Sequence, residues 1–499
     1  MNTLSSSDDI GTDFPTHPGI LRRIFSFPMM LAAALAMLAG LTVRSRVNDP
    51  DMWWHLKTGE VIWTTHRIPT TDLFSYTTNH HAWIPQEWLA QVSIYGAYRW
   101  GGYSGLMVWL YLFTIALIVA GYILCWLYSG NSKAAFLGAL IVWLFSTMIL
   151  AIRAQVIGYL FLTLEMLLLH LGSTRDRRWF LGLPPLFVLW VNCHGSFLLG
   201  FIVVGIFLFC SLFEFRAGLL VSSRWDSCRR RLLLFMFLFS AGVLFLNPVG
   251  VKQVFYPLNT MLQQHVGLSQ IEEWQPLQMS DLRGFAVPGI VGGIFLFLIV
   301  RRSELFLNEL LLLAMSAAFA MSHRRMTVVF GIFAAPVATR LFSTCWDNYD
   351  ERRDRPVVNA GLIMLALFLL VFSFPSRRYL AEQVDRGNPV GAVQFIRRNQ
   401  LSGHMLNAYN YGGYLIWALP EYPDFVDGRA DVLEWSGVLG EFARWATLEE
   451  DPHLLLNKYN VDFCLLERRS AIAHVLPLMR DWKLVYSDAD SVVFVRSGR

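Results

Sequence analysis

Eleven apolar segments separated by polar loops constrain this sequence more than any other feature. A helix needs about 20 apolar residues to cross a hydrocarbon core of roughly 30 Å. With 55% hydrophobic and 16% charged residues among 499, the chain can supply several spans and a separate domain. The sequence therefore predicts a polytopic α-helical membrane protein. The predicted spans are 24–43, 105–128, 134–150, 156–171, 180–191, 197–215, 232–246, 285–300, 305–321, 327–341 and 358–374.

Flanking charge predicts how these spans are oriented. Arginine gathers in alternate loops, for example in segments 229–231 and 352–355, and is scarce in the loops between them. The arginine-rich loops are expected to be cytoplasmic. The amino terminus is then cytoplasmic, and an odd number of spans places the carboxyl terminus outside. We expect a cytoplasmic tail at 1–23, a membrane domain at 24–376 and an extracytoplasmic domain at 377–499.

Two predicted outer segments are large enough to carry a function. The first, 44–103, contains stretches 53–63 and 87–100 with the apolar spacing of amphipathic helices. In the second, the tail at 377–499, short β-like runs alternate with helical ones, which predicts a small α/β domain. The β-like runs are 404–408, 424–426, 463–466, 483–486 and 492–495, and the helical ones are 390–399, 437–446 and 472–480.

Charge and cysteine content set aside two other classes of protein. The net charge of +4 is small and scattered, and no basic stretch interleaved with aromatic residues suggests a nucleic-acid partner. The six cysteines lie far apart, without a CxxC pair or zinc-ligand spacing. Neither a disulfide framework nor a structural zinc site is predicted.

A dense polar motif, DPDMWWH over residues 49–55, opens the first outer loop. Carboxylates two residues apart, here Asp49 and Asp51, can serve as a general base or as metal ligands. The structural alternative is that one of them caps a helix beginning at Pro50. His55 is a candidate substrate-binding residue on the same helix. The motif is the first candidate site, and which carboxylate acts as the base stays open.

Glu87 is the second acidic candidate in this loop. It stands between Trp83 and Trp88, where a helix returning to the membrane would begin. Stabilisation of the first helical turn by the helix dipole is a sufficient structural reason for a carboxylate there. Contact with substrate is the functional alternative.

Cations in three predicted outer turns form a third set of candidates. Arg153, His194, Arg324 and Arg325 lie on the side where arginine is otherwise scarce. A lipid phosphate would account for them, because a guanidinium group binds phosphate through two hydrogen bonds. The alternatives are snorkelling to headgroups and pairing with Asp49, Asp51 or Glu87. For His194, a hydrogen-bonded role in a tight turn is a further alternative.

Acidic and aromatic residues of later segments complete the candidates. Glu272 and Glu273, after the seventh span, either face the same outer cavity or are solvated loop carboxylates. In the tail, β-runs that break into helices place polar residues at strand ends, where open α/β sheets bind ligands. A salt-bridged turn supporting the domain is the alternative for segment 427–431. The tail candidates for acceptor binding are Tyr409, Tyr411, Asp427 and Arg429.

The order of these parts resembles the GT-C superfamily of polyprenyl-phosphate-dependent glycosyltransferases. The sequence is most similar to a bacterial branch of that superfamily, with more distant similarity to the catalytic subunits of oligosaccharyltransferases and protein O-mannosyltransferases. In oligosaccharyltransferase-like members a tail motif beginning WWDYG contacts the acceptor, and Asn410 stands here where the aspartate would be. The motifs that carry the resemblance are at 49–55, 83–89, 190–197, 246–250, 407–417 and 427–431.

The resemblance implies an inverting glycosyltransferase of the bacterial inner (cytoplasmic) membrane. Asp49 or Asp51 would deprotonate an acceptor at the outer face. The implied partners are a polyprenyl-phosphate-linked sugar, membrane lipid and a glycan or protein acceptor. The cofactor is either none or a divalent cation, Mg²⁺ or Mn²⁺. Two alternatives stay open: a flippase for lipid-linked glycans, disfavoured because no repeat is visible, and a non-catalytic assembly subunit.

Overall fold

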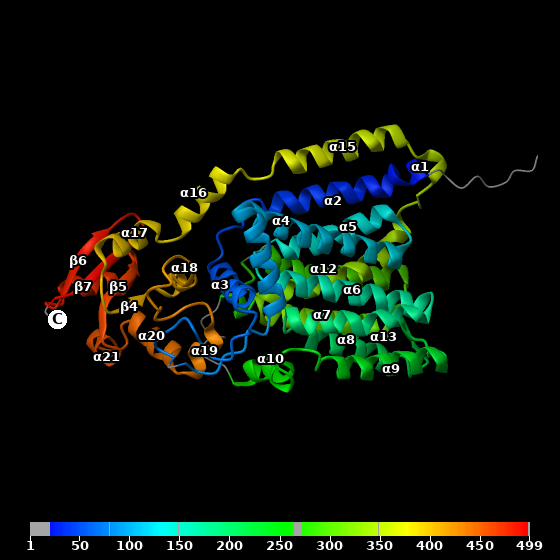
Figure 1. Cartoon of the computed structure of the whole chain (residues 1–499). Helices are drawn as coiled ribbons and strands as arrows, with labels where there is room; N and C mark the ends of the chain where they lie inside the picture. The colour runs from blue at the N-terminus through cyan, green and yellow to red at the C-terminus, as the bar shows by residue number, and fades with distance from the viewer. Residues whose placement is uncertain are drawn as a thin grey trace, which may run out of the picture.

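The computed structural model describes residues 20–497 except 79, 148, 264–271, 281 and 348. A bundle of apolar helices forms one end of the molecule, and a smaller α/β domain forms the other (Figure 1). The predicted cytoplasmic tail at 1–23 lies outside the described residues except for its last four, because the description begins at Ile20. The helical membrane domain followed by a small sheet domain agrees with the predicted fold class.

Each of the eleven predicted apolar segments is helical. The corresponding helices are α2 (Phe27–Val43), α4 (Trp88–Ser129), α5 (Ser132–Ser146), α6 (Gln155–Thr174), α7 (Leu183–Cys193), α8 (Phe197–Cys210), α9 (Ser227–Val243), α12 (Leu282–Arg301), α13 (Leu307–Ser322), α14 (Thr327–Phe342) and α15 (Pro356–Phe372). By length and apolar composition, four described helices qualify as membrane spans, and the bent pair of α15 and α16 (Arg377–Gly387) adds a fifth. Four more apolar helices have 14 to 17 residues. The number of eleven spans is therefore not confirmed.

Short elements connect the helices of the bundle. They are α1 (Ile20–Ile24), η1 (Arg177–Gly182), β1 (Phe215–Ala217), β2 (Leu220–Ser222), α10 (Val251–Gln263), η2 (Glu272–Trp274), β3 (Leu305–Phe306), η3 (Arg324–Met326), η4 (Ser343–Cys345) and η5 (Glu351–Arg353). The strands form a three-stranded sheet in the order β1-β2-β3.

The first predicted outer loop lies between the bundle and the tail domain (Figure 1). Its first amphipathic stretch is helix α3 (Pro50–Thr65). The second stretch is not separate, because α4 continues from Trp88 into the following span through a break at Gly102. Gly102 has φ 59° and ψ −140°, a backbone conformation that side chains with a Cβ rarely adopt. The loop and the span are thus joined by one bent helix.

The tail domain is built on a four-stranded sheet in the order β4-β5-β7-β6. The β4–β5 pair is parallel and the other two pairs are antiparallel. Four of the five predicted β-runs are strands, whereas 424–426 makes only an isolated bridge to Ser75. The domain comprises α17 (Val390–Asn399), β4 (His404–Asn407), α18 (Tyr409–Ala418), α19 (Ala430–Trp435), α20 (Val438–Ala446), α21 (Pro452–Lys458), β5 (Val461–Glu467), α22 (Ala471–Val475), η6 (Leu476–Leu478), β6 (Trp482–Ser487) and β7 (Ser491–Arg496).

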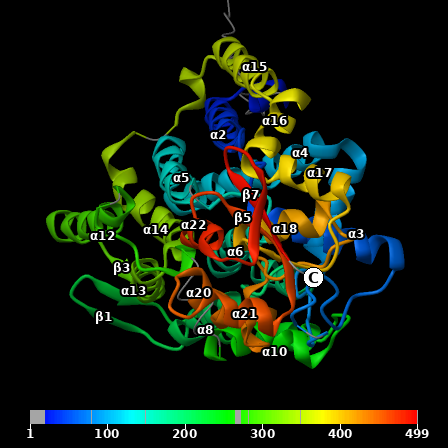
Figure 2. The same cartoon turned by 90° about the vertical axis from the view of Figure 1, so that its left-hand side faces the viewer.

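Two glycines let the tail domain pack tightly. Gly412 and Gly413 lie inside helix α18. A Cβ at Gly413 would be 2.3 Å from the carbonyl oxygen of Pro50, at the start of α3. A Cβ at Gly412 would be 2.1 Å from the carbonyl oxygen of Val426. The absence of a side chain at Gly413 lets α18 pack against the start of α3, and Figure 2 shows α18 beside α3.

Candidate functional site

Asp49 begins helix α3 and caps it. Its backbone is extended, Pro50 occupies the first helical position, and Asp49 Oδ1 accepts a hydrogen bond from Asp51 N at 3.0 Å. The capping interpretation of this motif is therefore correct. The same oxygen also accepts a bond from Arg153, so the cap is part of an ionic cluster.

Arg153, in the turn between α5 and α6, gathers three carboxylates from separate parts of the chain. Its Nε lies 2.8 Å from Asp49 Oδ1, and its Nη1 lies 3.1 Å from Asp51 Oδ2 and 2.9 Å from Glu273 Oε1. The predicted alternative of pairing with Asp49 or Asp51 is thus what the structure has. Glu273, from η2, joins the cluster rather than lying in a solvated loop.

Asp51 shares the Arg153 guanidinium with Asp49, and its side chain is 23% exposed against 14% for Asp49. Burial raises the pKa of Asp51 to about 6, although the nearby Arg153 guanidinium lowers it. Its Oδ1 accepts a bond from Trp54 Nε1 at 3.2 Å, and a Cβ at Gly428 of the tail domain would lie 2.0 Å from that oxygen. Asp51 therefore lies between α3, Arg153 and the tail.

Glu87 lies between two imidazoles instead of capping a helix. It is the first residue before α4 but makes no side-chain capping bond. Its Oε2 is 3.7 Å from His55 Nδ1, and its Oε1 is 3.5 Å from His194 Nε2. Burial raises the pKa of Glu87 to about 8 and lowers that of His194 to about 3. The group is thus neutral at pH 7, with a protonated carboxyl between two uncharged imidazoles.

His194 and His55 have further partners that fix their rings. His194 Nδ1 lies 2.8 Å from Ser196 Oγ, and it accepts a bond from Ser196 N at 3.1 Å. The hydrogen-bonded turn considered for His194 is therefore present. The centre of the His55 ring lies 3.7 Å from the centre of the Trp54 ring, and Trp54 Nε1 donates a hydrogen bond to Asp51. The histidine–glutamate group is in this way connected to the acidic motif.

Arg324 and Arg325 meet the loop that carries Glu273. Arg324 N donates to Gln275 O at 3.0 Å, and the Arg325 guanidinium lies 4.5 Å from the centre of the Trp274 ring. Arg325 also lowers the pKa of Glu87, against the stronger effect of burial. The structure therefore brings both arginines against the loop that carries Glu273, and it places Arg325 close enough to Glu87 to affect its pKa.

Asp427 and Arg429 form a fully buried ionic cluster with the outer loop. Arg429 Nε and Nη2 donate to the two oxygens of Asp427 at 2.9 and 2.6 Å, and Nη1 donates to Asp72 Oδ1 at 2.5 Å. Nη2 also donates to Ser75 Oγ at 3.0 Å. Both side chains have 0% exposure. This matches the predicted salt-bridged turn and leaves neither side chain a surface for an acceptor.

The two predicted tyrosines point to different surroundings. Burial raises the pKa of Tyr409, with a further contribution from the charge of Asp51, so Tyr409 lies near the acidic motif. The Tyr411 hydroxyl donates to Asp490 O at 3.0 Å within the tail domain. Tyr409 therefore stays a candidate for substrate contact, whereas Tyr411 helps to hold the tail together.

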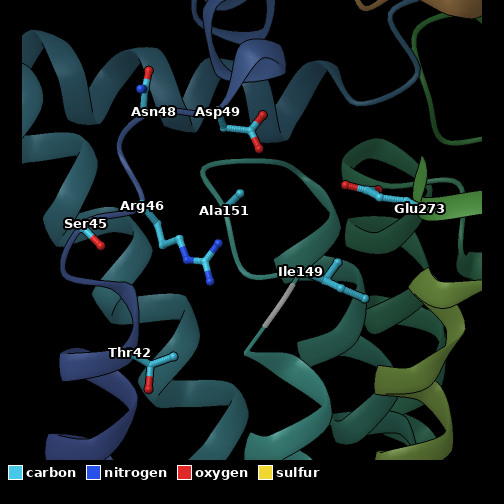
Figure 3. A pocket seen from close by; sticks show the side chains of 8 residues that line it. All are labelled: Thr42, Ser45, Arg46, Asn48, Asp49, Ile149, Ala151 and Glu273. Carbon is cyan, nitrogen blue, oxygen red and sulfur yellow. The ribbon is translucent and has the colours of Figure 1, made fainter. Parts of the chain in front are cut away.

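A cavity of about 310 Å³ lies beside the carboxylate cluster. Figure 3 shows Asp49 and Glu273 on its wall, with Arg46 extending into it from the segment between α2 and α3. Arg46 was not among the sequence candidates. The available signal was its place just after the first span, on the predicted outer side where arginine is scarce. The cavity is lined by Thr42, Ser45, Arg46, Asn48, Asp49, Ile149, Ala151 and Glu273.

The three carboxylates do not form a metal site in this structure. Their oxygens surround the Arg153 guanidinium, which supplies the positive charge there. Among the residues that the structure describes, no group of three or more His, Cys, Asp or Glu side chains is arranged to hold a metal ion. No catalytic step is assigned to a divalent cation.

Comparison with known proteins identifies the fold. No protein-family model and no curated protein matches the sequence. Among solved structures, the Archaeoglobus fulgidus oligosaccharyltransferase tethered to an acceptor peptide with an NVT sequon is similar at TM-score 0.54 and 12% identity, over 95% of this chain and 75% of that one. Its apo form matches over 87% and 69%, with the same score and identity.

A second enzyme has a similar structure. ArnT from Cupriavidus metallidurans, bound to undecaprenyl phosphate, matches at TM-score 0.52 and 12% identity, over 93% of this chain and 97% of that one. These neighbours are membrane enzymes of the GT-C superfamily. The chain shares the GT-C fold of these neighbours, as the sequence resemblance predicted, and its apolar helices indicate a multi-pass membrane protein.

Proposed function

We propose that the protein is a membrane glycosyltransferase that moves a sugar from a polyprenyl-phosphate carrier to an acceptor hydroxyl, with inversion at the anomeric carbon. One observation carries the proposal: Asp49, fixed by its helix cap and by Arg153, is part of the wall of a cavity lined by the end of α2, the segment before α3, the segment between α5 and α6, and Glu273 of η2. The GT-C fold supports it.

In the proposed reaction Asp49 is the general base. It accepts the proton of the acceptor hydroxyl while the acceptor oxygen attacks the anomeric carbon from the face opposite the phosphate. The bond between the anomeric carbon and the phosphate oxygen breaks, and its electron pair leaves with the polyprenyl phosphate. Asp51, which does not line the cavity, would hold Arg153 in place.

Positioning would supply most of the rate. A carboxylate is a modest base, so alignment of the acceptor and neutralisation of the leaving phosphate matter more than base strength. Arg324 and Arg325 are the proposed phosphate ligands, and they contact Gln275 and Trp274 in the loop that carries Glu273. The extracytoplasmic orientation, the bacterial inner membrane, the sugar and the acceptor all remain part of this proposal.

The test replaces Asp49 with asparagine in purified protein reconstituted into lipid nanodiscs. Release of polyprenyl phosphate from a panel of polyprenyl-phosphate sugars is measured with glycan and peptide acceptors. Asparagine also caps helices well, so Asp49→Asn keeps the cap and removes the base. We expect turnover to fall by at least a hundredfold, within the usual contribution of a general base.

The matched control is Asp226→Asn. Asp226 caps α9 by accepting a bond from Arg229 N at 2.9 Å, so it has the same local role outside the candidate site. This variant should keep parental turnover. Parental turnover in Asp49→Asn would refute the assignment of the base, and absence of transfer by the parental protein from every donor would refute the proposed function.

A further inference from the structure

Two of the residues predicted to bind phosphate, Arg153 and His194, do not offer an unpaired positive charge. Arg153 contacts three carboxylates, so a phosphate would have to displace one of them. His194 is uncharged at neutral pH, because burial and the Arg325 charge lower its pKa. A carrier phosphate at the cavity needs a cation there that no carboxylate holds.

Arg46 meets this requirement. Its side chain lines the cavity together with Asp49 and Glu273 (Figure 3). Within the described part of the chain, its guanidinium makes one hydrogen bond, from Nη2 to the carbonyl oxygen of Thr147 at 2.9 Å. That bond uses one of the five N–H groups of a guanidinium. The remaining groups can bind the oxygens of a phosphate.

A second arginine, Arg283 of helix α12, also binds Thr147, the residue that follows α5. Arg283 Nη2 donates to Thr147 Oγ1 at 2.6 Å, so Thr147 receives a bond from each of the two guanidinium groups. Three formal positive charges, on Arg46, Arg153 and Arg283, balance the three negative charges of the clustered carboxylates. A bound phosphate therefore adds to a neutral site rather than to an acidic one.

The surface next to Arg283 suits the apolar part of a lipid. Leu282 and Phe285, on either side of Arg283 at the start of α12, are 71% and 63% exposed. The exposed apolar side chains continue along this helix to Leu296, Ile299 and Val300. A guanidinium pair at the end of an apolar helix face fits a molecule with one phosphate and a long hydrocarbon chain.

We propose that Arg46 binds the phosphate of the polyprenyl carrier in this cavity, with the isoprenoid chain along α12. The inference rests on the proposed function and adds to it a ligand residue on the wall shared with Asp49. The phosphate of a bilayer phospholipid or free inorganic phosphate has the same recognition chemistry, so the experiment separates these sources.

Binding of undecaprenyl phosphate is measured by native mass spectrometry on the full chain in phosphatidylcholine nanodiscs. Undecaprenol, phosphatidylglycerol and inorganic phosphate are the comparison probes. We expect Arg46→Gln to weaken undecaprenyl phosphate binding about tenfold or more, as for loss of a charge-assisted hydrogen bond. Undecaprenol, which lacks the phosphate, should bind the parental protein and the variant equally.

Arg44→Gln is the matched control, since it removes the same charge two residues away. Arg44 is exposed, and its guanidinium lies 5.9 Å from the centre of the Tyr379 ring, outside the cavity. The affinity of the Arg44→Gln variant for undecaprenyl phosphate should stay within about twofold of the parental value, a free-energy difference of roughly 0.4 kcal/mol. Melting temperatures of both variants verify that they are folded.

Each result decides the inference. Equal losses in both variants, or no loss in Arg46→Gln, would overturn it while leaving the proposed glycosyl transfer intact. Equal competition by phosphatidylglycerol or inorganic phosphate would overturn the assignment to a polyprenyl carrier. If the parental protein binds no undecaprenyl phosphate, both the inference and the proposed donor class are wrong.

Discussion

Replacement of Arg429 by glutamine should destabilise the contact between the tail domain and the first outer loop. Arg429 has 0% exposure and contacts Asp427 and Asp72, which are also fully buried. Its guanidinium carbon lies 4.8 Å from the centres of both the Phe74 and Trp83 rings. The variant removes a charge that two buried carboxylates and two aromatic faces share.

The size of the effect follows from this burial. Removal of one partner from a buried ion pair costs about 3–5 kcal/mol, because the remaining charge is left uncompensated. For a cooperative unit of this size, 1 kcal/mol corresponds to roughly 2–4 °C in melting temperature. We therefore expect the tail and outer loop of Arg429→Gln to melt roughly 6–20 °C lower than in the parental protein.

Arg397→Gln provides a control within the same domain. Arg397 also donates twice to a carboxylate, that of Glu421, but the two side chains are 53% and 43% exposed. Exposed pairs contribute about 0.2–1 kcal/mol, so this variant should melt within about 4 °C of the parental protein. The assay is thermal unfolding in detergent, followed by tryptophan fluorescence and by limited proteolysis of the tail.

One result would refute the reasoning. If Arg429→Gln melts like Arg397→Gln but has lost acceptor binding, Arg429 is a ligand residue and not a structural one. Restoration of the melting temperature by a triple variant, Arg429→Leu with Asp427→Leu and Asp72→Asn, would support the structural role, since removal of the whole buried cluster leaves neither carboxylate charged and unpaired.

Three further predictions follow from other contacts. Folded Glu87 keeps its proton up to about pH 8, whereas the unfolded chain releases it near pH 4.5, so the parental protein loses stability as the pH rises between these values. Glu87→Gln should reduce this loss, and melting temperatures at pH 5 and pH 8.5 measure it. Gly428→Ala should reduce turnover, since its Cβ would lie 2.0 Å from Asp51 Oδ1, and unchanged transfer would contradict this. Tyr256→Phe should cost about 1 kcal/mol and speed hydrogen exchange in α10 and α19, because its hydroxyl donates to Asp431; equal exchange rates would argue against this contact.

The local sequence was sufficient for the helices and for the motif at the start of α3. A long apolar run has few alternatives to a helix in a bilayer, since every backbone N–H and C=O must be paired within it. Asp49 followed by Pro50 is similarly a local signal for a helix start, and the structure has that cap. The division into a helical bundle and a small α/β tail follows from the same local patterns.

The tertiary structure decided which side chains face one another. Arg153 meets carboxylates from residues 49, 51 and 273, and Arg429 meets Asp72 across 357 positions of the chain. Burial also set the charge states of Glu87 and His194, whose ordinary pKa values would make the first charged and the second partly so at neutral pH. The reason is physical: partners and desolvation depend on packing between distant segments, which hydropathy and spacing do not encode.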